Sequence, residues 1–111
     1  MPGIYDTTKI DLITRTKEGS AHLIIIEEQP WTGEEKQITA FLEKVNTYLT
    51  YALGTQFKEM YPDLAAQPAQ IKVMAFHEFD GITKKMFDHL QNDVKKRYSI
   101  DISFQLMEKE K

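Results

Sequence analysis

Two groups of polar residues that could do chemistry follow two apolar segments of the chain. Glu27 and Glu28 end an isoleucine-rich run, and His77, Glu78 and Asp80 follow a second apolar run. If both runs are parallel strands, these residues converge at the sheet edge where open α/β sheets bind ligands. One histidine with carboxylates could hold a divalent metal, or a carboxylate could act as a general acid or base. We favour the simpler interpretation that they close strands and cap a helix, since no recognised ligand spacing is present.

A second polar group lies on a predicted helix. Lys44, Tyr48 and Tyr51 share one side of this helix at positions i, i+4 and i+7, and Asn46 points elsewhere. The set could form a polar recognition face. Alternatively, Asn46 could satisfy a loop backbone while the tyrosines border the core, and this is the arrangement we expect.

Trp31 stands beside Pro30 at a predicted corner between a strand and a helix. An exposed tryptophan there could anchor a protein partner. We expect instead that Trp31 packs over the start of the helix, as a hydrophobic staple does. His22 and His89 are isolated, and the sequence has no glycine loop of the phosphate-binding kind. We therefore expect no catalytic residue, no metal site and no cofactor.

The composition is that of an ordinary globular domain. With 111 residues, 41% hydrophobic and 28% charged, the chain should form one domain over 1–111, with a core at about 8–106 and a frayed charged tail at 107–111. The net charge of −3 argues against nucleic acid as a partner, so the basic stretches 84–85 and 95–97 are assigned to a solvated helix face.

The absence of cysteine from the sequence suits a reducing compartment. Residues 1–10 lack the basic and apolar regions of a signal peptide. The apolar run 23–26 is far shorter than the ~20 residues of a membrane span. We expect a cytoplasmic protein that does not contact a membrane.

Hydrophobic patterning predicts four strands. Residues 9–16 and 21–28 should form a hairpin that turns at Gly19. The segment 70–79 is apolar on both sides, as in a central strand. The segment 100–106 alternates cleanly and should have one buried and one exposed face.

Two amphipathic helices are predicted between the strands. The first covers 33–53 and should begin with a capping box, in which Thr32 is the N-cap and Glu35 reaches back. The second should begin at Asp80 or Thr83. The apolar stripe of the first helix is Ile38, Phe41, Leu42, Val45, Tyr48, Leu49 and Ala52, and that of the second is Ile82, Met86, Phe87, Leu90, Val94 and Tyr98.

The order ββαβαβ predicts an α/β fold, an α+β two-layer sandwich with a four-stranded sheet and two helices on one face. Right-handed crossovers give the strand order 1-2-3-4 if strands two to four are parallel. The long connection 55–69 could instead bring the third strand back antiparallel.

The sequence contains a set of short motifs, which are Ile10-Asp11-x-Ile13, Pro30-Trp31, Leu42-Glu43-Lys44-Val45-Asn46-Thr47-Tyr48-Leu49, Gly54 and Tyr61-Pro62-Asp63. In these motifs the chain resembles a family of small bacterial proteins that is catalogued as a domain of unknown function. The resemblance covers roughly 8–106 and implies a compact α/β domain with no established activity. The turn at 31–33 departs from it, because more acidic residues would be expected there.

Apolar residues on both faces of the central strands bear on assembly, because two helices cover one face only. The other face would expose an apolar patch, which monomers rarely tolerate. We therefore expect a homodimer, formed face to face or by strand addition at 100–106. The segment 55–69 could instead cover the patch within one chain. The function we expect is a non-catalytic binding or protein-interaction module; the alternative is a metal- or small-molecule-binding domain, or a minor enzyme, that uses the acidic cluster.

Overall fold

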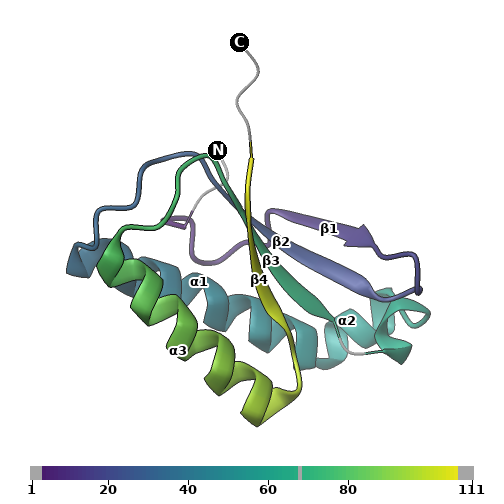
Figure 1. The fold of residues 1–111 in the computed structure, drawn as a ribbon. Helices are drawn as coiled ribbons and strands as arrows, with labels where there is room; N and C mark the ends of the chain where they lie inside the picture. The colour runs from purple at the N-terminus through teal and green to yellow at the C-terminus, as the bar shows by residue number, and fades with distance from the viewer. Residues whose placement is uncertain (1–3, 68, 108–111) are drawn as a thin grey trace.

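The order of elements follows the predicted alternation of strands and helices (Figure 1). The structure is a computed structural model and describes residues 4–67 and 69–107, so the end of the predicted tail lies outside the described part. The elements are β1 (Leu12–Arg15), β2 (Ala21–Glu27), α1 (Glu35–Leu53), α2 (Thr55–Met60), the 3-10 turn η1 (Leu64–Ala66), β3 (Gln70–Ala75), α3 (Gly81–Tyr98) and β4 (Ile102–Leu106).

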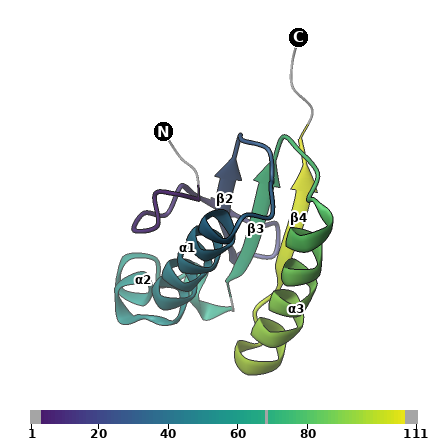
Figure 2. The same ribbon diagram turned by 90° about the vertical axis from the view of Figure 1, so that its left-hand side faces the viewer.

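The four strands form one sheet in the order β1-β2-β3-β4. β1 pairs antiparallel with β2, whereas β2, β3 and β4 are parallel. The direction of the third strand, which the sequence left open, is therefore parallel. Both long helices, α1 and α3, lie on the same face of the sheet (Figure 2). The predicted two-layer sandwich is confirmed.

The core lies between this sheet face and the two helices. From the sheet it takes Leu23, Ile25, Ile71 and Val73, all fully buried, and α1 and α3 add Phe41, Val45, Phe87 and Val94. Strand residues that face the helices alternate with residues that face away. The register confirms this, because Ile25 pairs with Val73, which pairs with Phe104.

Three residues of the predicted helix stripes point outward. Leu42 is 40% exposed, and Ile82 and Tyr98 are also exposed. Lys44 is fully buried instead, on the other flank of the stripe of α1. The reason is that the N-terminal segment covers that flank of α1, where Lys44 donates to the backbone oxygen of Asp6.

The predicted capping box at the start of α1 is wrong. The helix begins at Glu35, and its N-cap Glu34 makes no side-chain capping bond. Gly33 has a φ of +76°, so the chain turns in the left-handed region between Thr32 and the helix. The side chain of Gln37 holds this loop: its Oε1 accepts from Thr32 N at 2.7 Å, and its Nε2 donates to Pro30 O at 2.9 Å.

The segment 55–67 packs beyond the end of α1, on the helix side of the sheet (Figure 1). Phe57 and Leu64 are buried in the main core. The Gln67 side chain also holds the hairpin turn by donating to Glu18 O. The segment therefore does not cover the opposite sheet face, and that alternative is wrong.

Candidate functional site

The parallel strands bring the predicted acidic residues to one edge of the sheet, yet two of them, Glu27 and Asp80, are committed to local structure. Glu27 is only 3% exposed. Its carboxylate accepts from Gln29 N at 3.2 Å and from Ile4 N at 3.5 Å. Glu28 and Glu78 are exposed. Among residues 4–67 and 69–107, no group of three or more His, Cys, Asp or Glu side chains is placed to hold a metal ion.

Asp80 is the N-cap of α3, which confirms one of the two starts predicted for this helix. Its Oδ2 accepts from Ile82 N at 3.2 Å and from Thr83 N at 3.4 Å. Burial acts to raise the pKa of Asp80, but the adjacent Thr83 side chain and these N–H groups outweigh burial and lower it. In the structure, however, the Thr83 hydroxyl makes no hydrogen bond, and Asp80 Oδ1 is also buried without a hydrogen-bond partner. The geometry indicates a helix cap rather than a catalytic carboxylate.

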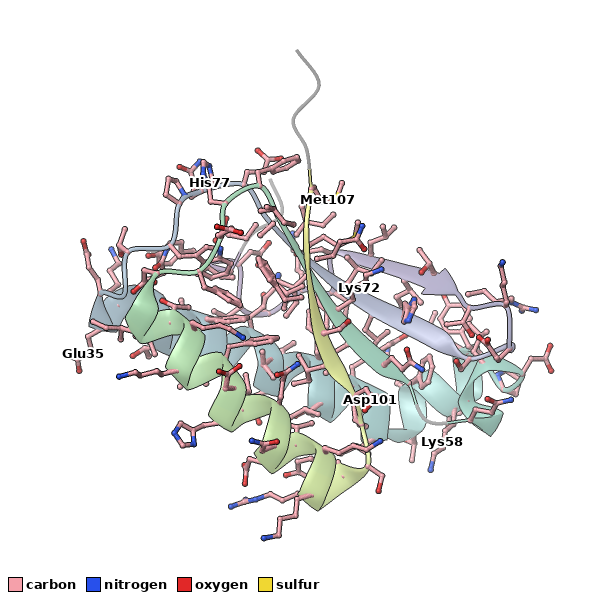
Figure 3. The ribbon with its side chains drawn as sticks, viewed as in Figure 1. Glu35, Lys58, Lys72, His77, Asp101 and Met107 are labelled. Carbon is pink, nitrogen blue, oxygen red and sulfur yellow. The ribbon has the colours of Figure 1, made fainter. Side chains whose placement is uncertain are left out.

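Trp31 packs against the helix layer, which confirms the structural interpretation. It is 6% exposed, and its ring lies 5.2 Å from that of Phe41 and 4.9 Å from that of Phe79. Its Nε1 donates to the backbone oxygen of His77 at 3.1 Å, which ties the loop after β2 to the loop after β3. The His77 side chain lies at the outer rim of that loop (Figure 3). Trp31 is therefore not available as an exposed anchor.

Lys44 and Tyr48 are both fully buried, so they do not form a recognition face. Lys44 Nζ lies 2.7 Å from Asp11 Oδ1, and Asp11 Oδ2 accepts from Ile26 N at 3.0 Å. The Tyr48 hydroxyl accepts from Asp11 N at 2.8 Å and donates to Ile24 O at 2.6 Å. This network joins α1 to the chain before β1 and to β2.

Asn46 is exposed and lines a shallow groove beside Thr7 and Thr39. The neighbouring Thr47 hydroxyl, rather than Asn46, bonds the N-terminal segment, through Thr7 O. Sequence reasoning missed Asp11 as the partner of Lys44. The available signal was a lysine among the apolar stripe residues of a helix, because a buried ammonium group needs a carboxylate.

The sheet face that points away from the helices is a larger feature, which we call the open face. Its apolar centre consists of Leu12, Ile24, Ile26 and Met74 on the strands and of Phe76, which directly follows β3 and continues its alternation. Of these, Ile24 is buried, Leu12 is 44% exposed, and the other three are partly exposed. None of the five belongs to the main core. In the part of the chain that the structure describes, no helix covers this face (Figure 1).

Polar residues border the apolar centre. His22 Nε2 and Gln70 Oε1 lie 2.8 Å apart at the amino end of β2 and β3. Lys72 is the next residue of β3 on this face, two positions after Gln70, and points away from the helices (Figure 3). An apolar centre with a polar border is the usual composition of a protein interface.

A sequence model of one family, described as a family of unknown function (DUF6572), matches residues 2–108. The chain belongs to DUF6572. Comparison with curated proteins and with solved structures finds no match. Family membership agrees with the resemblance seen in the sequence and provides no catalytic residue.

Two of the motif residues that suggested the family have structural roles in this DUF6572 chain: Lys44 and Tyr48 fasten α1 to the chain before β1 and to β2. No helix within 4–67 and 69–107 has the length and apolar character to cross a membrane.

Proposed function

We propose that this DUF6572 chain is a non-catalytic protein-interaction module and that the open face is its binding surface. The observation that carries the proposal is the apolar centre of the open face, which no described element covers. Contiguous exposed apolar surface with a polar border is typical of interaction sites in soluble proteins.

The other candidate surfaces support binding or catalysis less well. The Glu27 and Asp80 carboxylates are occupied by backbone N–H groups, so they are poorly placed to bind a ligand or move a proton. Three of the five cations of α3 pair with carboxylates: Lys84 with Asp88, Lys95 with Asp101 and Arg97 with Asp93. A nucleic-acid surface would instead present unpaired cations. The lack of cysteine suits a reducing compartment, and on that ground we place the module in the cytoplasm.

Site-specific photo-crosslinking in living cells tests the proposal. A photoreactive amino acid at Met74 should give protein adducts of discrete mass, because this side chain lies in the centre of the open face. The matched control is Lys85, an exposed position on α3. The interaction proposal fails if position 74 gives no protein adduct, or gives the same adducts as position 85.

A further inference from the structure

We infer that the partner of the open face is a second copy of this chain, bound face to face with the strands of the two sheets antiparallel. This inference rests on the proposed function and adds the identity of the partner. It is argued from the order of charged and apolar residues along β2 and β3.

The open face has a cationic end and an anionic end around its apolar centre. Ile26 and Met74 pair across β2 and β3 and mark the middle. Lys72 lies two residues before Met74, toward the amino end. Glu28 lies two residues after Ile26, toward the carboxyl end and one residue beyond the end of β2. The alternation of β2, continued by one residue, places it on the same side as Ile26. Glu28 is exposed and Lys72 partly exposed, so both can reach a partner.

A two-fold axis through the Ile26–Met74 pair, perpendicular to the strands, exchanges the two ends of the face. It brings Lys72 of each copy over the carboxyl end of the other copy, where Glu28 follows the end of the adjacent strand β2, about 5 Å to the side. The side chains of Lys72 and Glu28 are long enough to meet across sheets packed about 10 Å apart. The same axis places Met74 of one copy against Met74 of the other. The face is therefore complementary to itself, as an isologous interface requires.

A parallel arrangement lacks this match. With the two-fold axis along the strands, Lys72 would face the amino end of the second sheet. There the polar pair His22–Gln70 offers no carboxylate, and the Asp101 carboxylate, just before β4, already pairs with Lys95. Like ends would then meet like ends, and charge complementarity would be lost. Charge order thus selects the antiparallel geometry.

The size of the face sets the expected strength of the dimer. The four strands have 4, 7, 6 and 5 residues. At about 3.3 Å per residue and about 4.8 Å between strands, they give a footprint of roughly 350 Å² per copy. Stable interfaces bury about 800 Å² per partner. We therefore expect a weak, reversible dimer that forms at micromolar rather than nanomolar concentration.

Sedimentation equilibrium of the purified 111-residue chain, from low to high micromolar concentration, tests the inference. The mass should rise from 12.9 kDa toward twice that value. Met74→Glu should weaken association more than about tenfold, since it places a charge at the centre of the interface. Circular dichroism would confirm that this variant is folded.

Charge reversal tests the antiparallel geometry. Lys72→Glu and Glu28→Lys should each weaken the dimer, because each places like charges in contact, and the double variant should restore association. Lys85→Glu is the matched control; it makes the same charge change on α3 and should leave association unchanged.

Three results would overturn the inference. A monomer at every concentration excludes the second copy as partner. In that case the interaction proposal would still hold if position 74 gave adducts with another protein. A dimer that Met74→Glu leaves intact lies elsewhere, for example at the edge strand β4. A double charge reversal without recovery excludes the antiparallel arrangement.

Discussion

Lys44 Nζ and Asp11 Oδ1 lie 2.7 Å apart, and their side chains are 0% and 2% exposed. Lys44 Nζ also donates to Asp6 O at 2.7 Å. The ion pair thus fastens the chain before β1 along one flank of α1. Removing one partner of a buried ion pair costs far more than removing both, because a lone buried charge remains.

Lys44→Met should lower the free energy of unfolding by about 3–5 kcal/mol, since Asp11 is left buried without its cation. The double variant Lys44→Met, Asp11→Asn should recover part of this loss, because the amide can still accept from Ile26 N. Lys84→Met is the control; its pair with Asp88 is exposed and should contribute less than about 1 kcal/mol. Urea denaturation measures all three, and equal losses for Lys44 and Lys84 would contradict the burial of the ion pair.

The stability of the protein should fall above pH 10 because of Tyr48. Burial raises the pKa of this phenol in the folded state. The hydrogen bond from Asp11 N lowers the pKa and the negative charge of Asp11 raises it, so the net shift is upward. An unfolded tyrosine ionises near pH 10, at about its ordinary pKa. The contribution of the neutral Tyr48 phenol to stability is therefore complete below about pH 10. It is lost as the pH rises toward the folded-state pKa, at up to about 1.4 kcal/mol per pH unit.

Tyr48→Phe tests this pH dependence. The variant should be less stable at neutral pH by about 1–3 kcal/mol, because Ile24 O and Asp11 N lose a buried partner. Its stability should then decline less steeply than that of the parent above pH 10. Urea melts at several alkaline pH values give both slopes, and identical slopes would show that Tyr48 is not the group responsible.

Gln37, rather than a capping box, should stabilise the loop before α1. Gln37→Ala removes the bonds to Thr32 N and Pro30 O from a side chain that is 4% exposed, and should cost about 1–3 kcal/mol. Glu35→Ala removes no capping bond and should change stability by less than about 0.5 kcal/mol. A larger loss of stability for Glu35→Ala than for Gln37→Ala in urea melts would instead support the capping box.

The sequence predicted the strand order well, because strand order depends on periodicity and handedness, but it left the direction of the third strand open. Strand and helix periods identified six of the elements, and right-handed crossovers then allow one order of parallel strands. Trp31 was also predicted correctly, since a large apolar ring beside a helix start can bury itself locally.

The candidate site was less predictable because its partners are distant in sequence or belong to the backbone. The hydrogen bonds of Glu27 come from the N–H groups of Ile4 and Gln29, which carry no residue-specific signal. Whether Leu42 or Lys44 is buried depends on which flank of α1 the chain before β1 covers. A helical pattern alone does not contain that information.

Gly33 should not tolerate a side chain. Its φ is +76°, and a Cβ there would lie 2.5 Å from Asp80 Oδ2, so Gly33→Ala should cost about 2 kcal/mol or more. Gly81 has no atom within 4 Å of an added Cβ and begins α3, so Gly81→Ala should be neutral or stabilise by up to about 1 kcal/mol. In thermal melts the unfolding temperature should therefore fall for Gly33→Ala and stay unchanged or rise for Gly81→Ala.

Phe41 and Leu42 are neighbours on α1, and truncation should destabilise the protein strongly at Phe41 and little at Leu42. Phe41 is fully buried and its ring is stacked parallel to that of Phe87, with centroids 6.3 Å apart; Phe41→Ala should cost about 3–5 kcal/mol by leaving a cavity. Leu42 is 40% exposed on the outer side of the helix, so Leu42→Ala should cost less than about 1 kcal/mol. Urea melts of both variants check the rotation of α1 about its axis. A large loss at Leu42 would mean that this flank of the helix is buried, which would in turn require Lys44 to face solvent and the ion pair with Asp11 to be absent.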